Sequence, residues 1–454
     1  MSKAVKIRKG LNIALQGEAD KVCANAVEAK QFAIKPTDFH GVMPKLIGKE
    51  GHKLKAGSVL FYDKNNEKVK YVSPVSGVIK EIKRGAKRKI LEVLITPDGK
   101  DTFELHDVAD PSELSRDEII DKMLEAGLWP FVKMRPVDII ANSDDTPKMI
   151  VVSAFDSHPL APDYNYLLKD DQASFQTGIN ALAKLTEGTL HLNIRGEKKQ
   201  NSVFEDCSNV QINYFGGCHP CGNVGVQIHH IEPINKGEVV WTVNPADVAT
   251  IGKFFMSGRF DTERTIALTG SMVKEPKYFK TKIGASIASL ADGNIDSGNS
   301  RIISGNVLTG DMTDMDGFVG YYHQQITVIP EGDRHKFFLK DGWLSLGYNR
   351  FSMSMAYPTM LNPPSRRWDL DTNLNGEKRA FVVTEQYEKV FPFDIYPVYL
   401  LKSILANDID GMEKLGIYEV APEDFALCEF VCTSKINSQQ IVRDGLDIIK
   451  EECL

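Results

Sequence analysis

The sequence predicts a chain of several domains, in which α/β and α+β units are joined to a small β module and a helical C-terminal part. The 454 residues are too many for one core, because domains usually hold about 100 to 200 residues. Strand and helix patterns alternate over residues 112–255, whereas short apolar runs and turn residues dominate residues 39–95. No apolar run approaches the roughly 20 residues of a membrane-spanning helix.

Charge is spread unevenly along the chain. The formal net charge is −7, but residues 1–100 hold 21 Lys/Arg against 10 Asp/Glu, so this part carries +11 and the remainder −18. A basic module on an acidic body indicates a docking face for an acidic partner or an anionic membrane, or simply a solvated surface. Nucleic acid is not expected as a partner, because the lysines are scattered and not interleaved with aromatic residues.

The N-terminus is basic, but no apolar segment follows it, so we do not expect a secretory signal. We therefore expect a cytoplasmic protein whose association with a membrane is peripheral. The seven cysteines are an odd and sparse set for this length, which predicts reduced thiols and not a disulfide framework.

Residues 1–38 are expected to form an N-terminal segment, followed by a β domain over 39–100. Its motifs, Gly51–Leu60 and Ser73–Ile79, resemble those of lipoyl/biotinyl-type barrel-sandwich domains. Such domains attach their cofactor to a lysine at a hairpin tip, and Lys64 stands in that position here. The flanking sequence does not match the carrier motif, so covalent lipoylation or biotinylation is only an alternative.

A Rossmann-like α/β domain is predicted over residues 101–258. Helical spacing of apolar residues marks 112–128 and 171–186, and the first of these has acidic residues at its start. Apolar runs of strand length complete the alternation, at 150–155, 190–194, 210–214 and 239–243. This alternation is typical of a three-layer fold with a largely parallel sheet.

Three parts follow the α/β domain. Residues 259–335 predict an α+β unit of β-grasp (SLBB-like) size, interrupted by a loop rich in Gly, Asn, Asp and Ser at 292–317. Residues 336–379 are expected to connect this unit to a helical domain over 380–454. The helical domain contains Cys428 and Cys432, whose spacing matches only the last pair of a ferredoxin cluster motif, so we describe it as degenerate ferredoxin-like and expect no cluster.

Cys218-His-Pro-Cys221 is the most distinctive local motif in the sequence. A C-x-x-C pair can contribute to a zinc site, cycle as a dithiol, or stand in a structural loop. No second C-x-x-C is present, and four glycines surround the motif, which favours the structural loop. The His229-His230 pair after the alternating run from Val224 to Ile228 is interpreted as packed or hydrogen-bonded and not as catalytic. The chain contains no dinucleotide, P-loop, nucleophile-elbow or zincin motif, so nothing predicts a self-contained active site.

A set of motifs runs nearly from end to end of the chain: Ile7–Gly17, Phe155–Asp163, Phe215–Gly225, Ile228–His230, Trp241–Asn244, Asp247–Val248, Ile251–Gly252, Thr281–Ala285, Arg301–Leu308 and Phe351–Ser352. Taken together, these motifs resemble the A-subunit family of the sodium-translocating NADH:quinone oxidoreductases. That family resembles the C subunit of the Rnf complex and, more distantly, the flavoprotein subunit of respiratory complex I.

The resemblance implies an enzyme complex that uses FAD, FMN, riboflavin, an iron–sulfur centre, NADH, quinone and Na⁺. Its relatives bind FMN and NADH through a glycine-rich loop, and residues 126–136 correspond to that loop here. This stretch keeps Gly127, but it contains bulky side chains and Pro130, which lacks an N–H. We therefore expect no catalytic residue, redox cofactor or metal in this chain, and a supporting role in quinone reduction coupled to Na⁺ export.

Four residues of this stretch, Trp129, Phe131, Lys133 and Arg135, are candidates for a surface that faces quinone or the membrane-embedded B subunit. Aromatic rings can stack on a quinone ring, and cations can bind its carbonyl oxygens. The resemblance also implies that the chain lies on the cytoplasmic face of the bacterial inner membrane beside the B subunit. The alternative is a flavoprotein that binds FMN and NADH like the Rnf C subunit.

Overall fold

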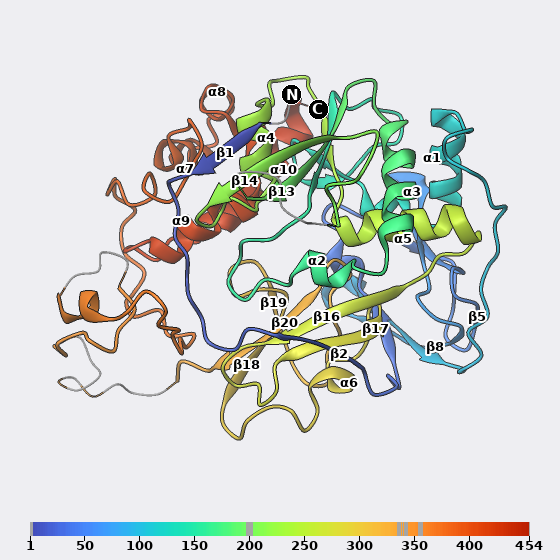
Figure 1. Cartoon of the computed structure of the whole chain (residues 1–454). Helices are drawn as coiled ribbons and strands as arrows, with labels where there is room; N and C mark the ends of the chain where they lie inside the picture. Colours follow the sequence, from blue (N-terminus) through green and yellow to red (C-terminus); the bar gives the residue numbers. More distant parts are fainter. Residues whose placement is uncertain are drawn as a thin grey trace.

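The computed structural model describes residues 3–196, 203–333, 337, 339, 344–352 and 357–453. Four sheets and a group of C-terminal helices build the chain (Figure 1). Among the described residues, no helix is both long and apolar enough to cross a membrane.

Two small antiparallel sheets form the β domain near the N-terminus. One has the order β3-β9-β8-β5 and the other β4-β6-β7. Their strands are β3 (Phe32–Ile34), β4 (Pro44–Leu46), β5 (Lys53–Leu54), β6 (Val59–Asp63), β7 (Asn66–Val72), β8 (Gly77–Arg84) and β9 (Ile90–Pro97). Phe61 and Tyr71 stack at 4.6 Å between ring centroids in their shared core. Lys64 is exposed in the two-residue turn between β6 and β7, where Asp63 accepts a hydrogen bond from the Asn65 amide.

A seven-stranded sheet with the order β1-β14-β13-β12-β15-β10-β11 forms the centre of the chain. Its strands are β1 (Ala4–Ile7), β10 (Lys133–Arg135), β11 (Ile139–Ile140), β12 (Met149–Ser153), β13 (Thr189–Arg195), β14 (Gln211–Gly217) and β15 (Val240–Thr242). The neighbours from β1 to β15 are parallel, and β10 and β11 continue the sheet antiparallel. The buried runs predicted as strands at 150–155, 190–194, 210–214 and 239–243 therefore all lie in this sheet.

Helices cover both faces of this sheet and give three layers. Ile150 and Val152 of β12 belong to the core that contains α1 (Arg116–Glu125), α3 (Gln172–Ala183) and α5 (Pro245–Ser257). Met149 and Val151 point the other way and pack with Ile228 of α4 (Val224–Ile231). Such alternation within one strand follows from the two-residue period of β structure.

The helix ends and helix contacts have clear local causes. Ser115 and Glu118 form a capping box at the start of α1, and Asn244 caps α5. The helices α3 and α5 lie so close that a Cβ on Gly252 would stand 1.7 Å from the Ser174 carbonyl oxygen. The run of alternating apolar residues Val224, Val226 and Ile228 lies in the helix α4. Three apolar residues at i, i+2 and i+4 are too few to distinguish the period of a helix from that of a strand.

The β-grasp part is a six-stranded sheet with the order β19-β18-β20-β16-β17-β2. Its elements are β2 (Asp20–Asn25), β16 (Glu263–Thr269), β17 (Lys277–Lys282), the short α6 (Ala288–Ala291), β18 (Ser300–Ser304), β19 (Asp311–Thr313) and β20 (Gln325–Pro330). Residues 1–38, expected as a separate segment, thus contribute one strand to each of three sheets: β1, β2 and β3.

The C-terminal part is helical, with α7 (Pro397–Leu405), α8 (Ile409–Lys414), the 3-10 turn η6 (Pro422–Phe425), α9 (Ala426–Val431) and α10 (Ser438–Cys453). Its core includes Leu400, Phe425 and Leu446 together with Ile7 and Phe215 of the central sheet. The helical domain therefore packs directly against the edge of the central sheet that β1 and β14 form, and this contact positions η6 for the site described below.

Candidate functional site

The site lies where the strand order of the central sheet reverses. From β12 the chain continues to β13 and β14 on one side, and later returns to β15 on the other side of β12. Ligands of open α/β sheets bind in the crevice at the carboxyl ends of the strands on either side of such a reversal. Here that crevice is bordered by residues after β12, residues after β15, and the loop between β14 and α4.

Asp156, Ser157 and His158 follow β12 and form a polar cluster with His219 of the Cys218–Cys221 loop. Asp156 accepts a short hydrogen bond from His158 Nδ1, and Ser157 Oγ lies 2.9 Å from His219 Nδ1. The two imidazole rings lie 4.7 Å apart between centroids. The Nε2 atoms of both rings are buried and have no hydrogen-bond partner among the described residues.

Burial and charge set the protonation of this cluster. Burial opposes ionisation of Asp156, but the charge of His158 and its hydrogen bonds outweigh it and lower the pKa of Asp156 to about 2. Burial would lower the pKa of His158, yet the Asp156 carboxylate raises it above its usual value. Burial, together with the positive charge of His158, lowers the pKa of His219 to about 3. Of the two rings, His158 therefore binds a proton more readily than His219.

The N-terminus of α4 points into the same crevice, but side chains of the protein itself occupy it. A Cβ on Gly225, in the first turn, would lie 2.4 Å from Arg135 Nη1 and 2.6 Å from Asp424 Oδ2. Arg135 Nη1 donates to Asp424 Oδ2 at 2.8 Å, and Arg135 Nη2 donates to Glu423 Oε1 at 2.6 Å. The Asp424 carboxylate therefore packs against the side of the first turn of α4, a helix end of the kind that attracts anions; among the described residues no amide of this turn donates to it, and its Oδ2 accepts from Arg135 and from the Ala421 amide.

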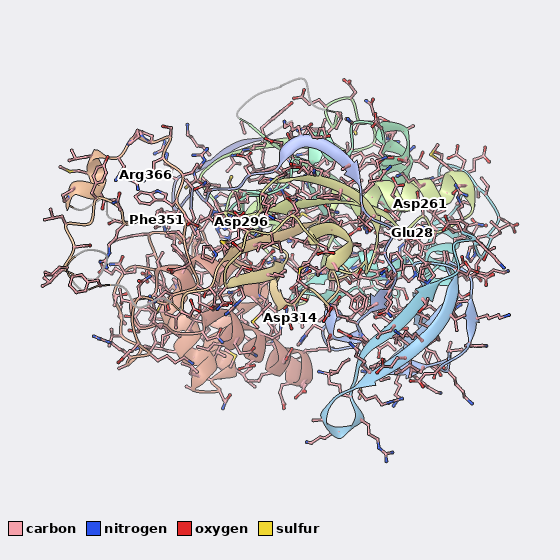
Figure 2. All side chains as sticks on the ribbon, turned by 90° about the horizontal axis from the view of Figure 1, so that it is seen from below. Glu28, Asp261, Asp296, Asp314, Phe351 and Arg366 are labelled. Carbon is pink, nitrogen blue, oxygen red and sulfur yellow. The ribbon has the colours of Figure 1, made fainter. Side chains whose placement is uncertain are left out.

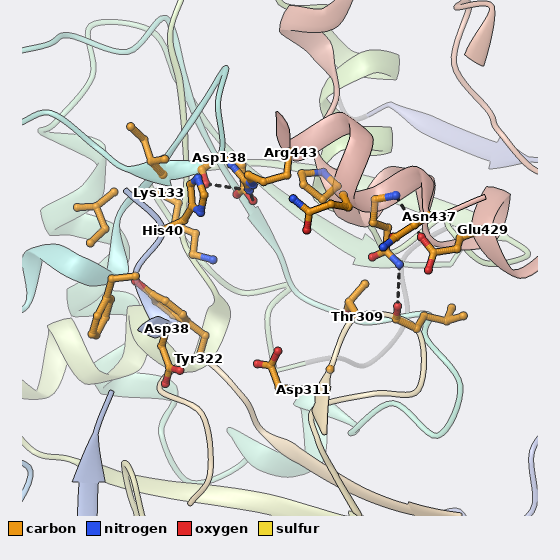
Figure 3. Close-up of a pocket in the computed structure, with 18 residues that line it drawn as sticks. Asp38, His40, Lys133, Asp138, Thr309, Asp311, Tyr322, Glu429, Asn437 and Arg443 are labelled. Carbon is orange, nitrogen blue, oxygen red and sulfur yellow. Dashed lines mark hydrogen bonds and ion pairs between the residues drawn. The ribbon is translucent and has the colours of Figure 1, made fainter. Parts of the chain in front are cut away.

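Two cavities open at this crevice and share Lys133, Asp138 and Tyr322 in their walls. The smaller one, about 200 Å³, lies at the strand ends and is bordered by Phe131, His158 and other residues. The larger one, about 710 Å³, lies where all four parts of the chain meet. Figure 3 shows its lining, which includes Asp38, His40, Lys133, Asp138, Thr309, Asp311, Tyr322, Glu429, Asn437 and Arg443.

The four residues that the sequence predicted to face quinone or the B subunit lie in different surroundings in the structure. Trp129 is fully buried: its ring meets Trp241 edge to face at 5.4 Å, and its Nε1 donates to the Ala141 carbonyl at 2.7 Å. Arg135 is equally buried in the ion pairs described above. Phe131 is buried and borders the small cavity. Lys133 is half-buried and borders both cavities, with Nζ 4.1 Å from the centroid of the Tyr322 ring.

Sequence reasoning singled out no role for Asp156, His158 or Asp424, nor for Asn223, which borders the small cavity and donates from Nδ2 to the Glu423 carbonyl at 3.4 Å. The first two could have been found, because polar residues that directly follow a buried strand mark the carboxyl edge of a parallel sheet. Asn223 lies between a glycine-rich loop and a helix, but the helix was not recognised. Asp424 carries no local signal, since its partner Arg135 lies 289 positions away.

The two cysteine pairs lie in different surroundings. Cys218 is half-buried and Cys221 is buried in the loop between β14 and α4, and burial raises the pKa of Cys221 to about 11. Cys428 and Cys432 are both buried in the helical core. Within the described part of the chain, no group of three or more His, Cys, Asp or Glu side chains is arranged to hold a metal ion.

Comparison with known families gives three matches that follow the domains in order. Residues 5–98 match the NqrA N-terminal barrel-sandwich hybrid domain, residues 114–260 the NqrA second alpha/beta domain, and residues 265–314 the NQRA C-terminal domain, which is of the SLBB type. These matches confirm the predicted barrel-sandwich, α/β and β-grasp units.

Full-length relatives agree with these matches. Proteins named as the A subunit of the Na(+)-translocating NADH-quinone reductase, from Hahella chejuensis and from Haemophilus influenzae strain KW20, are each 36% identical, over 99% of this chain and 100% of their own. A solved structure of an NAD⁺-reducing [NiFe]-hydrogenase covers 74% of this chain and 61% of its own at 10% identity, with a TM-score of 0.40, too distant to bear on function. The two full-length relatives show that the chain belongs to the A-subunit family of the Na⁺-translocating NADH-quinone reductases.

Proposed function

We propose that the chain acts as a peripheral subunit on the cytoplasmic face of the sodium-translocating reductase, docked against the membrane-embedded B subunit, and holds no redox cofactor of its own. In this proposal the flavins and the iron–sulfur centre of the complex belong to other subunits. The chain supports quinone reduction by shaping and stabilising the complex.

The observation that carries this proposal is the internal carboxylate at the N-terminus of α4. A flavin mononucleotide or a dinucleotide needs a free helix N-terminus or glycine loop for its phosphate. Here Asp424 and Arg135 pack on the first turn of α4 at Gly225. Displacing Asp424 would leave the buried Arg135 without one of its two carboxylate partners, which is costly.

Two further features support the same conclusion. Gly127, the glycine retained in the loop that corresponds to the FMN loop of relatives, faces Val72 of the barrel-sandwich domain, and a Cβ there would lie 2.5 Å from Val72 Cγ1. The cavity at the strand ends holds about 200 Å³, whereas pockets for drug-sized ligands hold roughly 300 to 1,000 Å³. The cavity at the strand ends is therefore too small for a flavin nucleotide.

We further propose that the larger cavity is where this chain approaches the quinone or the subunit that holds it. Lys133 borders this cavity with its ammonium group above the Tyr322 ring, and it remains the best placed of the four predicted residues. Its ammonium group can donate a hydrogen bond to a quinone carbonyl. The buried side chains of Trp129 and Arg135 stabilise the segment that carries Lys133.

The test is purification of the complex through a tag on this chain, followed by flavin and iron analysis of the complex and of the chain expressed alone. We expect membrane subunits to co-purify and the isolated chain to be colourless. Stoichiometric flavin or iron in the isolated chain would contradict the proposal.

In the complex, Lys133→Met is expected to raise KM for quinone several-fold, whereas the exposed control Lys184→Met is expected to leave it unchanged.

A further inference from the structure

A strongly basic hairpin projects from the barrel-sandwich domain and takes no part in the site described above. We define the basic hairpin as residues 80–91, the distal parts of β8 and β9 and the turn between them. It holds six Lys/Arg and a single acidic residue. Figure 2 shows the light-blue β8–β9 hairpin reaching beyond the rest of the chain.

The tip of the basic hairpin has a defined conformation. Gly85 N donates to the Lys89 carbonyl at 2.8 Å, and Lys89 N donates to the Ala86 carbonyl at 3.1 Å. Lys87 and Arg88 both adopt left-handed backbone conformations, with φ of 52° and 63°. Positive φ at both central residues of a tight turn matches the twist of an antiparallel hairpin, so the turn holds the two cations at the tip of the hairpin.

The charges at the tip are exposed and are not neutralised by the chain. The side chains of Arg84, Lys87, Arg88 and Lys89 are all exposed, and no ion pair to any of them is found among the described residues. Within the basic hairpin, only Lys83 has such a partner, Glu92 at 2.9 Å. A cluster of unpaired cations on a projecting tip concentrates positive potential at the surface.

An apolar side chain accompanies these cations. Leu91 is 38% exposed and packs beside Gly85, where a Cβ would lie 3.1 Å from Leu91 Cδ1. A hairpin that presents several cations and a partly exposed leucine fits the interface of a lipid bilayer, where headgroup phosphates meet the cations and the acyl boundary accepts the apolar group. A flat acidic protein surface would satisfy the cations but not the leucine.

We propose that the basic hairpin binds the phosphate headgroups of anionic phospholipids at the membrane surface. This inference rests on the proposed position of the chain at the membrane, and it adds a direct lipid contact to the contacts with membrane subunits. The binding is electrostatic, so it depends on the fraction of anionic lipid and weakens as the salt concentration rises.

The test is flotation of the full-length chain with vesicles of phosphatidylcholine containing 30% phosphatidylglycerol, compared with vesicles of phosphatidylcholine alone. The triple variant Lys87→Gln, Arg88→Gln, Lys89→Gln is expected to bind the anionic vesicles about 100-fold more weakly, since each cation near such a surface contributes roughly fivefold. The matched control replaces Lys64, Lys184 and Lys414, which are also exposed, by glutamine and is expected to change binding less than threefold.

The outcomes separate this inference from the proposed function. Absence of binding to anionic vesicles, or equal losses in the two triple variants, would overturn the lipid contact even if membrane subunits still co-purify with the tagged chain. Loss of co-purification in the 87–89 variant with unchanged vesicle binding would overturn it too, in favour of an acidic protein partner. Circular dichroism and the melting temperature of each variant confirm that the fold is intact.

Discussion

Arg135 and Asp424, which are 289 positions apart, form a buried ion pair at 2.8 Å on the first turn of α4. Arg135 ends a strand of the central sheet, and Asp424 belongs to η6 of the C-terminal helical domain. The pair therefore joins two domains and at the same time packs against the first turn of α4, beside the crevice.

Breaking this pair is expected to destabilise the chain strongly. Arg135→Met leaves the carboxylate of Asp424 buried without its cation, which costs about 3 to 5 kcal/mol of unfolding free energy. Urea unfolding of the full-length chain measures the loss. The control is Lys68→Met, whose ion pair with Asp144 is solvent-exposed and is worth about 0 to 1 kcal/mol. Equal effects of the two substitutions would contradict the buried character of the Arg135 pair.

Gly127→Ala tests the contact between the α/β domain and the barrel-sandwich domain. Gly127 has φ of 74°, and the new Cβ would meet Val72 Cγ1 at 2.5 Å. Gly51→Ala is the matched control, because Gly51 has φ of 82° but no atom within 4 Å of the added Cβ. Both variants share the cost of a left-handed alanine, so the extra destabilisation of Gly127→Ala, about 1 to 3 kcal/mol, reports the overpacking alone. Identical melting temperatures of the two variants would refute this contact.

The Asp156–His158 pair predicts a specific dependence of stability on pH. Asp156 has a lowered pKa in the folded state, so its contribution is present above the ordinary value of 3.8 and is lost as the pH falls towards 2. His158 has a raised pKa, so its contribution is present below 6.5 and is lost as the pH rises through its folded value. The pair therefore stabilises most between about pH 4 and 6.5.

Asp156→Asn is expected to cost about 2 kcal/mol at pH 5.5, the equivalent of the lowered pKa of Asp156, and clearly less near pH 2.5. Denaturant unfolding at a series of pH values measures the difference from the wild-type chain. The exposed Asp170→Asn serves as the control and is expected to give only a small difference. A constant cost of Asp156→Asn across this range would show that the pair does not titrate as described.

Thiol reactivity tests the structural role of the Cys218–Cys221 loop. Cys23 is the only one of the seven cysteines that is exposed, whereas Cys221 is buried and burial raises its pKa to about 11. N-ethylmaleimide at pH 7.5 is therefore expected to modify Cys23 at least tenfold faster than Cys221, because the thiolate is the reactive form. Peptide mass spectrometry over time measures both rates, and the Cys23→Ser variant should lack the fast phase. Rapid modification of Cys221, or a Cys218–Cys221 disulfide in mild oxidant, would favour dithiol chemistry.

Much of the fold could be predicted because its signals are local. The helix predicted at 171–186 is α3, from Gln172 to Ala183, and the strand predicted at 190–194 is β13. In both, the apolar residues keep one period over a whole element. The helix α4 was not recognised because it has only eight residues and follows a glycine-rich loop. In addition, Val224 and Val226 are two residues apart, which is also the period of a strand.

The site could be predicted only in part, because its key contacts join distant parts of the chain. The sequence drew attention to residues 126–136, and Lys133 of this stretch borders both cavities. It could not reveal that Arg135 turns inward, since its carboxylate partners are brought close only by the packing of the helical domain. The quinone- or partner-facing role of the four residues stays a prediction.

The first 25 residues also constrain how the protein is made. β1 pairs with β14 at residues 211–217, and β2 pairs with β17 at residues 277–282. Both strands are translated before their partners, so they stay unpaired in these sheets until residues 211–217 and 277–282, respectively, have been made. Such long-range pairing slows folding and exposes strand edges in the meantime.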